Sequence, residues 1–92
     1  MSEFEGKRVF VTGSGAGIGK AIAALFTERG ARVVISDRDA DAAKQAADEI
    51  GAAGVANCDV TDETQVQSAI RQAVDLLGGL DVLVNNAGIE VS

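Results

Sequence analysis

The sequence predicts an α/β protein built on a Rossmann-type parallel sheet, of which the 92 residues would form a first, truncated half. Four short apolar runs alternate with three amphipathic segments, a pattern typical of right-handed β-α-β crossovers. A glycine-rich turn at residues 13–19 separates the first run from the first amphipathic segment, and Asp37 follows the second run. We therefore expect one domain over residues 1–92, with elements β-α-β-α-β-α-β and spatial strand order 3-2-1-4.

The first strand is expected at residues 7–12, where a charged start leads into an apolar run that stops at Gly13. The first helix is expected at residues 17–29, with Gly30 as its C-terminal cap. Its apolar residues recur at helical spacing, which places four of them on the face expected to be buried: Ile18, Ile22, Leu25 and Phe26.

The second strand is predicted at residues 32–36, a β-branched run that ends at Asp37. The acidic segment 37–39 opens an alanine-rich helix that Gly51 closes. A third strand is expected at residues 55–60.

The third helix begins after Thr61 or Asp62, either of which can cap it, and stops at Gly78-Gly79. Its apolar face is expected to carry Val66, Ile70, Val74 and Leu77. Residues 82–84 form the fourth strand, which should be an open edge of the sheet.

Charge and composition exclude several classes of partner. The net charge is −6, so a nucleic-acid backbone or an anionic membrane surface would be repelled, and no run approaches the roughly 18 apolar residues of a membrane span. Cys58 is the single cysteine and the chain has no histidine, so we expect neither an internal disulfide nor a metal site. A cytoplasmic protein fits these features.

The turn Thr12-Gly13-Ser14-Gly15-Ala16-Gly17-Ile18-Gly19 predicts a phosphate-binding loop. Gly13 allows a tight exit from the strand, Gly17 and Gly19 allow close helix–strand packing, and helix N–H groups with the macrodipole attract anions. An alternative is that the glycines only form a tight turn in an ordinary α/β domain. A Walker-type ATP site is disfavoured, because Ser14 replaces its first glycine and Ala21 its magnesium-binding hydroxyl residue.

The loop and Asn85-Asn86-Ala87-Gly88, together with Cys58-Asp59-Val60 and Leu80–Val84, resemble the short-chain dehydrogenase/reductase family over essentially the whole chain. The resemblance implies an oxidoreductase that transfers hydride between the nicotinamide of NAD or NADP and an alcohol or ketone.

The resemblance also implies which residues contact the dinucleotide. The loop should line the pyrophosphate and nearby ribose, Asp59 and Val60 the adenine, and residues 86–88 the ribose on the nicotinamide side. The full expected set is Gly13, Ser14, Gly15, Gly17, Ile18, Gly19, Asp37, Arg38, Asp59, Val60, Asn86, Ala87 and Gly88. Two alternatives stay open: Asp59 caps a turn, and Asn85 or Asn86 ties strands together.

Asp37 favours NAD over NADP, since its carboxylate can accept hydrogen bonds from ribose hydroxyls and would repel a 2′-phosphate. Arg38 beside it works against that preference. Family members that prefer NADP often carry a basic residue where this chain has Ala16.

The family's catalytic Ser, Tyr and Lys, the last two in Tyr-x-x-x-Lys spacing, have no counterpart here, and the chain contains no tyrosine at all. We therefore expect no catalytic residue and no activity from this chain alone, which leaves open whether it is an enzyme. The competing hypotheses are a non-catalytic dinucleotide-binding or self-assembling module, which would form a homo-oligomer through the exposed edge or face, and another Rossmann class such as a methyltransferase. Residues 85–88 disfavour the methyltransferase. Substrate and reaction direction are not predicted.

Overall fold

Within residues 3–86 the fold is the predicted one: a parallel sheet with strand order 3-2-1-4 and three helices. The computed structural model describes residues 3–86. In chain order its elements are β1 (Arg8–Thr12), α1 (Gly17–Glu28), β2 (Arg32–Ile35), α2 (Ala40–Ile50), β3 (Gly54–Val55), α3 (Glu63–Leu77) and β4 (Val82–Asn85). Val9 of β1 lies between Val33 of β2 and Val82 of β4, so β1 is a central strand.

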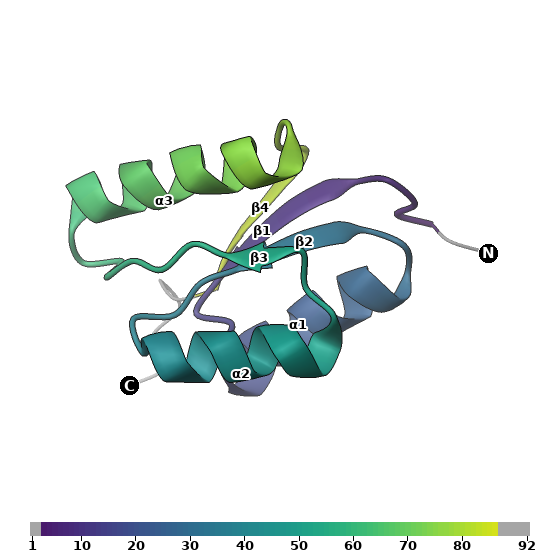
Figure 1. Cartoon of the computed structure of the whole chain (residues 1–92), viewed down its shortest axis with the longest axis horizontal. Helices are drawn as coiled ribbons and strands as arrows, with labels where there is room; N and C mark the ends of the chain where they lie inside the picture. The colour runs from purple at the N-terminus through teal and green to yellow at the C-terminus, as the bar shows by residue number, and fades with distance from the viewer. Residues whose placement is uncertain (1–2, 87–92) are drawn as a thin grey trace.

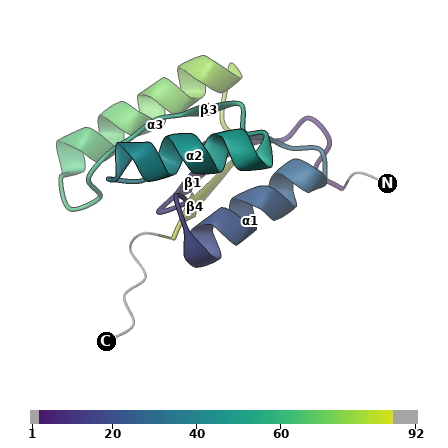
Figure 2. The ribbon, with the colours of Figure 1, turned by 60° about the horizontal axis from the view of Figure 1, so that its bottom comes forward.

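Helices α1 and α2 cover one face of the sheet and α3 covers the other (Figures 1 and 2). Because side chains of a strand alternate between the two faces, each face has its own core. Val9, Val11, Val33 and Ile35 pack with α1 and α2, whereas Phe10 and Val34 pack with α3. The expected alternation of strands and crossover helices therefore produces a three-layer molecule.

Small residues form the centre of the buried helix faces. In α1, Gly19 and Ala23 are buried, while Ile18 is 74% and Leu25 46% exposed, so the prediction that these two large residues are buried is wrong. Ile22 and Phe26 do pack against the core. In α3 the buried residues are Ala69, Ala73 and Leu77, and Val66, Ile70 and Val74 are only half-buried. A helix approaches a sheet most closely along its small residues, and larger apolar side chains then lie beside that line.

The third strand is shorter than residues 55–60. It ends at Val55, and the chain turns at Asp59, whose Oδ1 accepts hydrogen bonds from the N–H (2.9 Å) and Oγ1 (2.6 Å) of Thr61. Asp62, not Thr61, then caps α3 by accepting from the N–H groups of Thr64 and Gln65. Asp59 and Val60 consequently lie on a loop rather than in a strand.

The start of α2 also differs slightly from expectation. Strand β2 ends at Ile35, one residue early, and α2 begins at Ala40 with Asp39 as its cap. Asp37 and Arg38 therefore belong to the loop between β2 and α2, at the carboxyl edge of the sheet.

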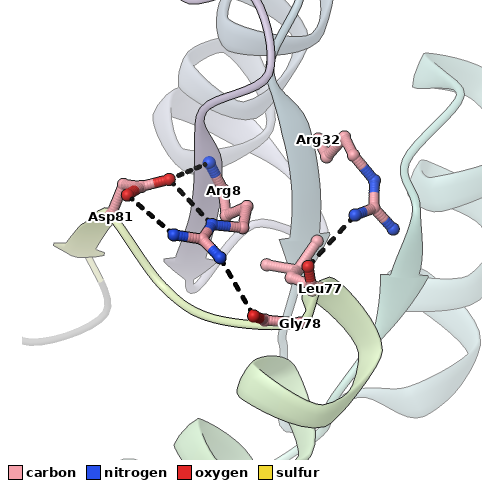
Figure 3. Close-up of polar contacts among 5 residues, drawn as sticks. All are labelled: Arg8, Arg32, Leu77, Gly78 and Asp81. Carbon is pink, nitrogen blue, oxygen red and sulfur yellow. Dashed lines mark hydrogen bonds and ion pairs between the residues drawn. The ribbon is translucent and has the colours of Figure 1, made fainter.

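Two arginines close the amino end of the sheet (Figure 3). Arg8 binds Asp81 through its main-chain N–H (2.8 Å), Nε (3.0 Å) and Nη2 (3.2 Å), and its Nη1 donates to the carbonyl of Gly78 (2.9 Å). Arg32 donates to the carbonyl of Leu77 (3.1 Å). Because the last carbonyls of a helix have no partner within it, these bonds satisfy the C-terminus of α3 and join it to β1 and β2.

Within residues 3–86, no helix is long and apolar enough to cross a membrane. The same part of the chain contains no group of three side chains suited to hold a metal ion. The cytoplasmic location stays a prediction.

Candidate functional site

The glycine-rich loop joins β1 to α1 at the carboxyl end of the sheet. Gly13 and Gly17 have φ values of 61° and 60°, which favour glycine. A Cβ at Gly19 would overlap the carbonyl oxygen of Gly13 and lie 2.7 Å from Nδ2 of Asn86. Gly19 therefore provides the close packing expected of it, whereas Gly17 is required for its conformation and its Cβ position is open, with nothing within 4 Å.

The N-terminus of α1 differs from those of the other helices. Its N-cap residue is Ala16, which makes no side-chain capping bond, and its first turn holds no acidic residue. Helices α2 and α3 are capped by Asp39 and Asp62, each followed by an acid in the first turn. The first N–H groups of a helix have no partner within it, so those of α1 are suited to an anion.

Lys20, the basic residue in the first turns of α1, pairs with α2 and not with the loop. The ammonium group of Lys20 forms an ion pair with Glu49 of α2, and the bond lowers the pKa of that carboxyl. Any affinity of the loop for a phosphate group therefore rests on main-chain N–H groups and the helix dipole rather than on Lys20.

Ser14 belongs to the frame that supports the loop. Its side chain is fully buried and its Oγ donates to the carbonyl of Val11 (2.7 Å) while accepting from the N–H of Ser36 (3.0 Å). Its own N–H donates to the carbonyl of Ser36 (2.8 Å). The hydroxyl and the N–H of Ser14 are therefore both bonded inside the protein, unlike the groups of the loop residues that face outward.

Asp37 lies beside the loop at the end of β2. Its Oδ2 accepts from the N–H of Gly15 (3.1 Å), and its Oδ1 accepts from the N–H of Asp39 (3.1 Å). Its own N–H donates to Oδ1 of Asn57 (3.4 Å). Asn57 is a residue that the sequence reasoning missed; its only signal is a polar side chain between the apolar residues Ala56 and Cys58.

A hollow of about 320 Å³ opens next to Asp37. Its lining residues are Gly13, Asp37, Arg38, Cys58, Asp59, Val60 and Thr61. Five residues expected from the sequence, drawn from three separate loops, therefore meet around one space. A second hollow, of about 490 Å³, shares Arg38, Cys58 and Asp59 with it.

The carboxylate of Asp59 already has a structural task. The hydroxyl and N–H of Thr61 both donate to it and hold its pKa below the ordinary value, with a smaller contribution from the charge of Arg38. The turn-capping role that the sequence left open is therefore present in the structure. Since a carboxylate accepts about four hydrogen bonds, Asp59 can also serve a ligand in the hollow.

The asparagines at the end of β4 tie the strands and the loop together. Thr12 Oγ1 of β1 donates to Oδ1 of Asn85 (3.1 Å), and Nδ2 of Asn86 donates to the carbonyl of Gly13 (3.2 Å). These bonds fix the end of β4 against the loop, which is the second role left open by the sequence. Ala87 and Gly88 lie outside the described residues.

The combined arrangement fits a dinucleotide. The uncapped N-terminus of α1 and the open space over Gly17 suit a pyrophosphate, and the adjoining hollow suits an adenosine, with Asp37 available to ribose hydroxyls. Cys58 is buried against Ser36, with Sγ and Oγ 3.6 Å apart, so its packing is structural.

Comparison with known proteins gives one family. A model of the family described as "short chain dehydrogenase" matches residues 7–92. The 7alpha-hydroxysteroid dehydrogenase of Escherichia coli K12 is 48% identical over 88 residues, which cover 91% of this chain and 34% of that protein. The sorbitol dehydrogenase of Cereibacter sphaeroides is 42% identical over 86 residues, covering 92% and 34%.

Solved structures give the same result. A short chain dehydrogenase from Mycobacterium smegmatis superposes with a TM-score of 0.91 at 37% identity, covering 99% of this chain and 40% of that one. A 3-ketoacyl-(acyl-carrier-protein) reductase from Brucella melitensis, solved in complex with NADH, has a TM-score of 0.83 at 39% identity and covers 88% and 34%. The chain thus spans about a third of the length of the curated relatives it matches.

Proposed function

Since the chain belongs to the short-chain dehydrogenase family, we propose that it is the cofactor-binding part of an NAD(P)-dependent oxidoreductase acting on an alcohol or ketone. A bound nicotinamide would supply hydride transfer. The chain itself would bind and orient the dinucleotide.

One observation carries the proposal: the N-terminus of α1, which has no capping side chain, lies beside the hollow that Asp37 borders. The N–H groups of Gly17, Ile18 and Gly19, in the first turn of α1, would bind the pyrophosphate. Gly13 and Gly15 would let the ligand approach the main chain. Val60 would offer an apolar wall for adenine, with Arg38 and Asp59 around it, and Asn86 would hold the loop from the other side.

Within this proposal NAD is the preferred cofactor. The carboxylate of Asp37 borders the hollow and would accept hydrogen bonds from adenosine ribose hydroxyls, while its charge would oppose a 2′-phosphate. Arg38 lines the same hollow and would soften that discrimination.

Calorimetric titration of the 92-residue chain with NAD and NADP tests the proposal. We expect NAD to bind more tightly, and Asp37→Ala to weaken NAD binding about tenfold through loss of a charged hydrogen-bond acceptor. Asp48→Ala, which removes the same charge from an exposed position on α2, is the matched control and should leave both affinities unchanged. Failure of the unmodified chain to bind either dinucleotide would refute the proposal.

A dehydrogenase assay on a panel of alcohols accompanies the titration. The chain offers no Tyr to donate a proton to a substrate, so we expect binding without turnover. Turnover by the 92 residues would contradict the expectation that this chain holds no catalytic residue.

The second candidate, a self-associating module, is favoured by strand β4. In the part of the chain that the structure describes, β4 pairs only with β1, and Val82–Asn85 carries neither a charge nor a proline that would discourage further pairing. Leu83 is 47% exposed and borders an apolar hollow of about 320 Å³ that Val66 and Ile70 also line. A second copy presents the same edge, so two chains can pair about a twofold axis.

Sedimentation of the chain at micromolar concentration tests this candidate. We expect a dimer that Leu83→Lys converts to a monomer, because the charge would be buried in the joined sheet. A monomer at every concentration would remove the candidate and leave dinucleotide binding untouched.

A further inference from the structure

Gly15 differs from the other glycines of the loop in why it must lack a side chain. Gly13 and Gly17 have positive φ, and Gly19 lies against the main chain of Gly13. Gly15 has no positive φ, so its backbone would accept other residues. What a Cβ there would meet is the carboxyl group of Asp37, with Oδ2 at 2.9 Å and Cγ at 3.0 Å.

Two main-chain hydrogen bonds hold the carboxylate of Asp37 in place. The Gly15 N–H donates to Oδ2 and the Asp39 N–H donates to Oδ1, so each oxygen has one main-chain donor. A carboxylate accepts about four hydrogen bonds, which leaves acceptor capacity for a ligand in the hollow that Asp37 borders. Two N–H groups therefore fix the direction of a charge that stays available to a ligand.

We propose that Gly15 is a positioning residue that sets the carboxylate of Asp37 and, through it, the choice between NAD and NADP. The proposal rests on the proposed dinucleotide binding. A side chain at position 15 displaces the carboxylate, which removes the acceptor for a ribose hydroxyl and the negative charge that opposes a 2′-phosphate.

A double-mutant cycle of Gly15→Ala and Asp37→Ala tests the coupling by titration with NAD and NADP. We expect Gly15→Ala alone to lower NAD affinity about tenfold, as loss of the Asp37 contact would, and to raise NADP affinity, because the charge that opposes the 2′-phosphate is displaced. In the Asp37→Ala background the same substitution should change neither affinity. Equal losses for both dinucleotides, or losses that persist without Asp37, would overturn the proposal, since a merely structural role of Gly15 has that result.

Amide hydrogen exchange of the ligand-free protein gives a second readout. Asp37→Ala should raise the exchange rate of the Gly15 N–H, while the Ser14 N–H, bound to the carbonyl of Ser36, serves as the internal control. An unchanged Gly15 rate in a protein that binds NAD would overturn this proposal alone. Absence of dinucleotide binding by the unmodified chain would overturn it together with the proposed function.

Discussion

Two helix termini at opposite ends of the parallel sheet, the C-terminus of α3 and the N-terminus of α1, differ in whether side chains bond their main-chain groups. At the amino end, Arg8 and Arg32 donate to the last carbonyls of α3, and Asp81 pairs with Arg8. At the carboxyl end, the first turn of α1 has no side-chain cap and no acid. The C-terminus of α3 is therefore held by side chains from two strands, whereas the N-terminus of α1 has no capping side chain, unlike α2 and α3, whose N-termini are capped by Asp39 and Asp62. Substitutions at the two ends should separate stability from binding.

Gly19→Val is expected to have the largest effect, because it should lower both stability and dinucleotide binding. The new side chain would overlap the carbonyl of Gly13, which is main chain and cannot move aside cheaply. We expect a loss of stability on the order of 3 kcal/mol, together with loss of dinucleotide binding. Urea denaturation followed by circular dichroism measures the first; an unchanged midpoint would show that the loop yields more readily than its contacts indicate.

Gly17→Val should lower dinucleotide affinity in addition to its cost in stability, and a control at another positive-φ glycine separates the two effects. The Cβ position of Gly17 is open, so the side chain would occupy the space proposed for the pyrophosphate and lower NAD affinity more than tenfold. Gly51→Val is the matched control, because Gly51 also has positive φ (72° against 60°), lies at a helix end and has nothing within 4 Å of its Cβ position. Each substitution should cost roughly 2 kcal/mol of stability. Equal affinities in the two variants would exclude Gly17 from the site.

Asp81→Asn tests the amino end. The side chain and then the main-chain N–H of Arg8 lower the pKa of Asp81 from its ordinary 3.8 to about 2. A carboxyl whose pKa is lower in the folded state than in the unfolded state stabilises the folded state at a pH above its unfolded-state pKa. This stabilisation is lost as the pH falls through the folded-state pKa. We therefore expect the variant to melt a few degrees lower at pH 7, with the difference fading between pH 3.8 and about 2.

Dinucleotide affinity of Asp81→Asn should match that of the unmodified chain at pH 7, since Asp81 lies at the far end of the sheet. Asp75→Asn, an exposed acid on α3, controls for the change in net charge. A melting difference that persists below pH 2 would mean that the variant acts through something other than the charge of Asp81.

Lys20→Ala should have the smallest effect of the series. The ion pair with Glu49 is partly exposed, and such pairs contribute little, so the melting temperature should change by no more than about 2 °C. NAD affinity should stay within about twofold, with Lys44→Ala as the control. A tenfold loss would show that Lys20 leaves Glu49 to bind a phosphate, which would add a side chain to a site proposed to rest on main-chain donors.

The strand order was predictable, because alternating strands and helices joined by right-handed crossovers leave few topologies. The helix faces were predicted less well. Hydrophobic spacing selected Ile18 and Leu25, but the closest approach of α1 to the sheet follows Gly19 and Ala23, and only packing in three dimensions distinguishes the two lines.

For the candidate site, the sequence predicted where residues lie better than which hydrogen bonds they make. The acidic residue after the second strand and the family resemblance selected Asp37, Asp59 and Val60, and the structure brings all three to one hollow. The sequence did not reveal that Ser14 faces inward or that Asn57 supports Asp37, because both depend on which hydrogen-bond partner a neighbouring loop presents. The early end of the third strand at Val55 was also not predicted, because the apolar run at residues 55–60 does not show where strand pairing stops.

The central position of β1 has a consequence for the order in which the protein forms. Arg8 and Asp81 are 73 residues apart, so the strand made first receives its second neighbour last. At ribosomal rates of 5–20 residues per second, that gap lasts roughly 4 to 15 seconds. During it, the edge of β1 that later pairs with β4, at Val9, Phe10 and Val11, would have no partner strand from this chain. The hydrogen bonds between Arg8 and Asp81 therefore form only at the end of this interval.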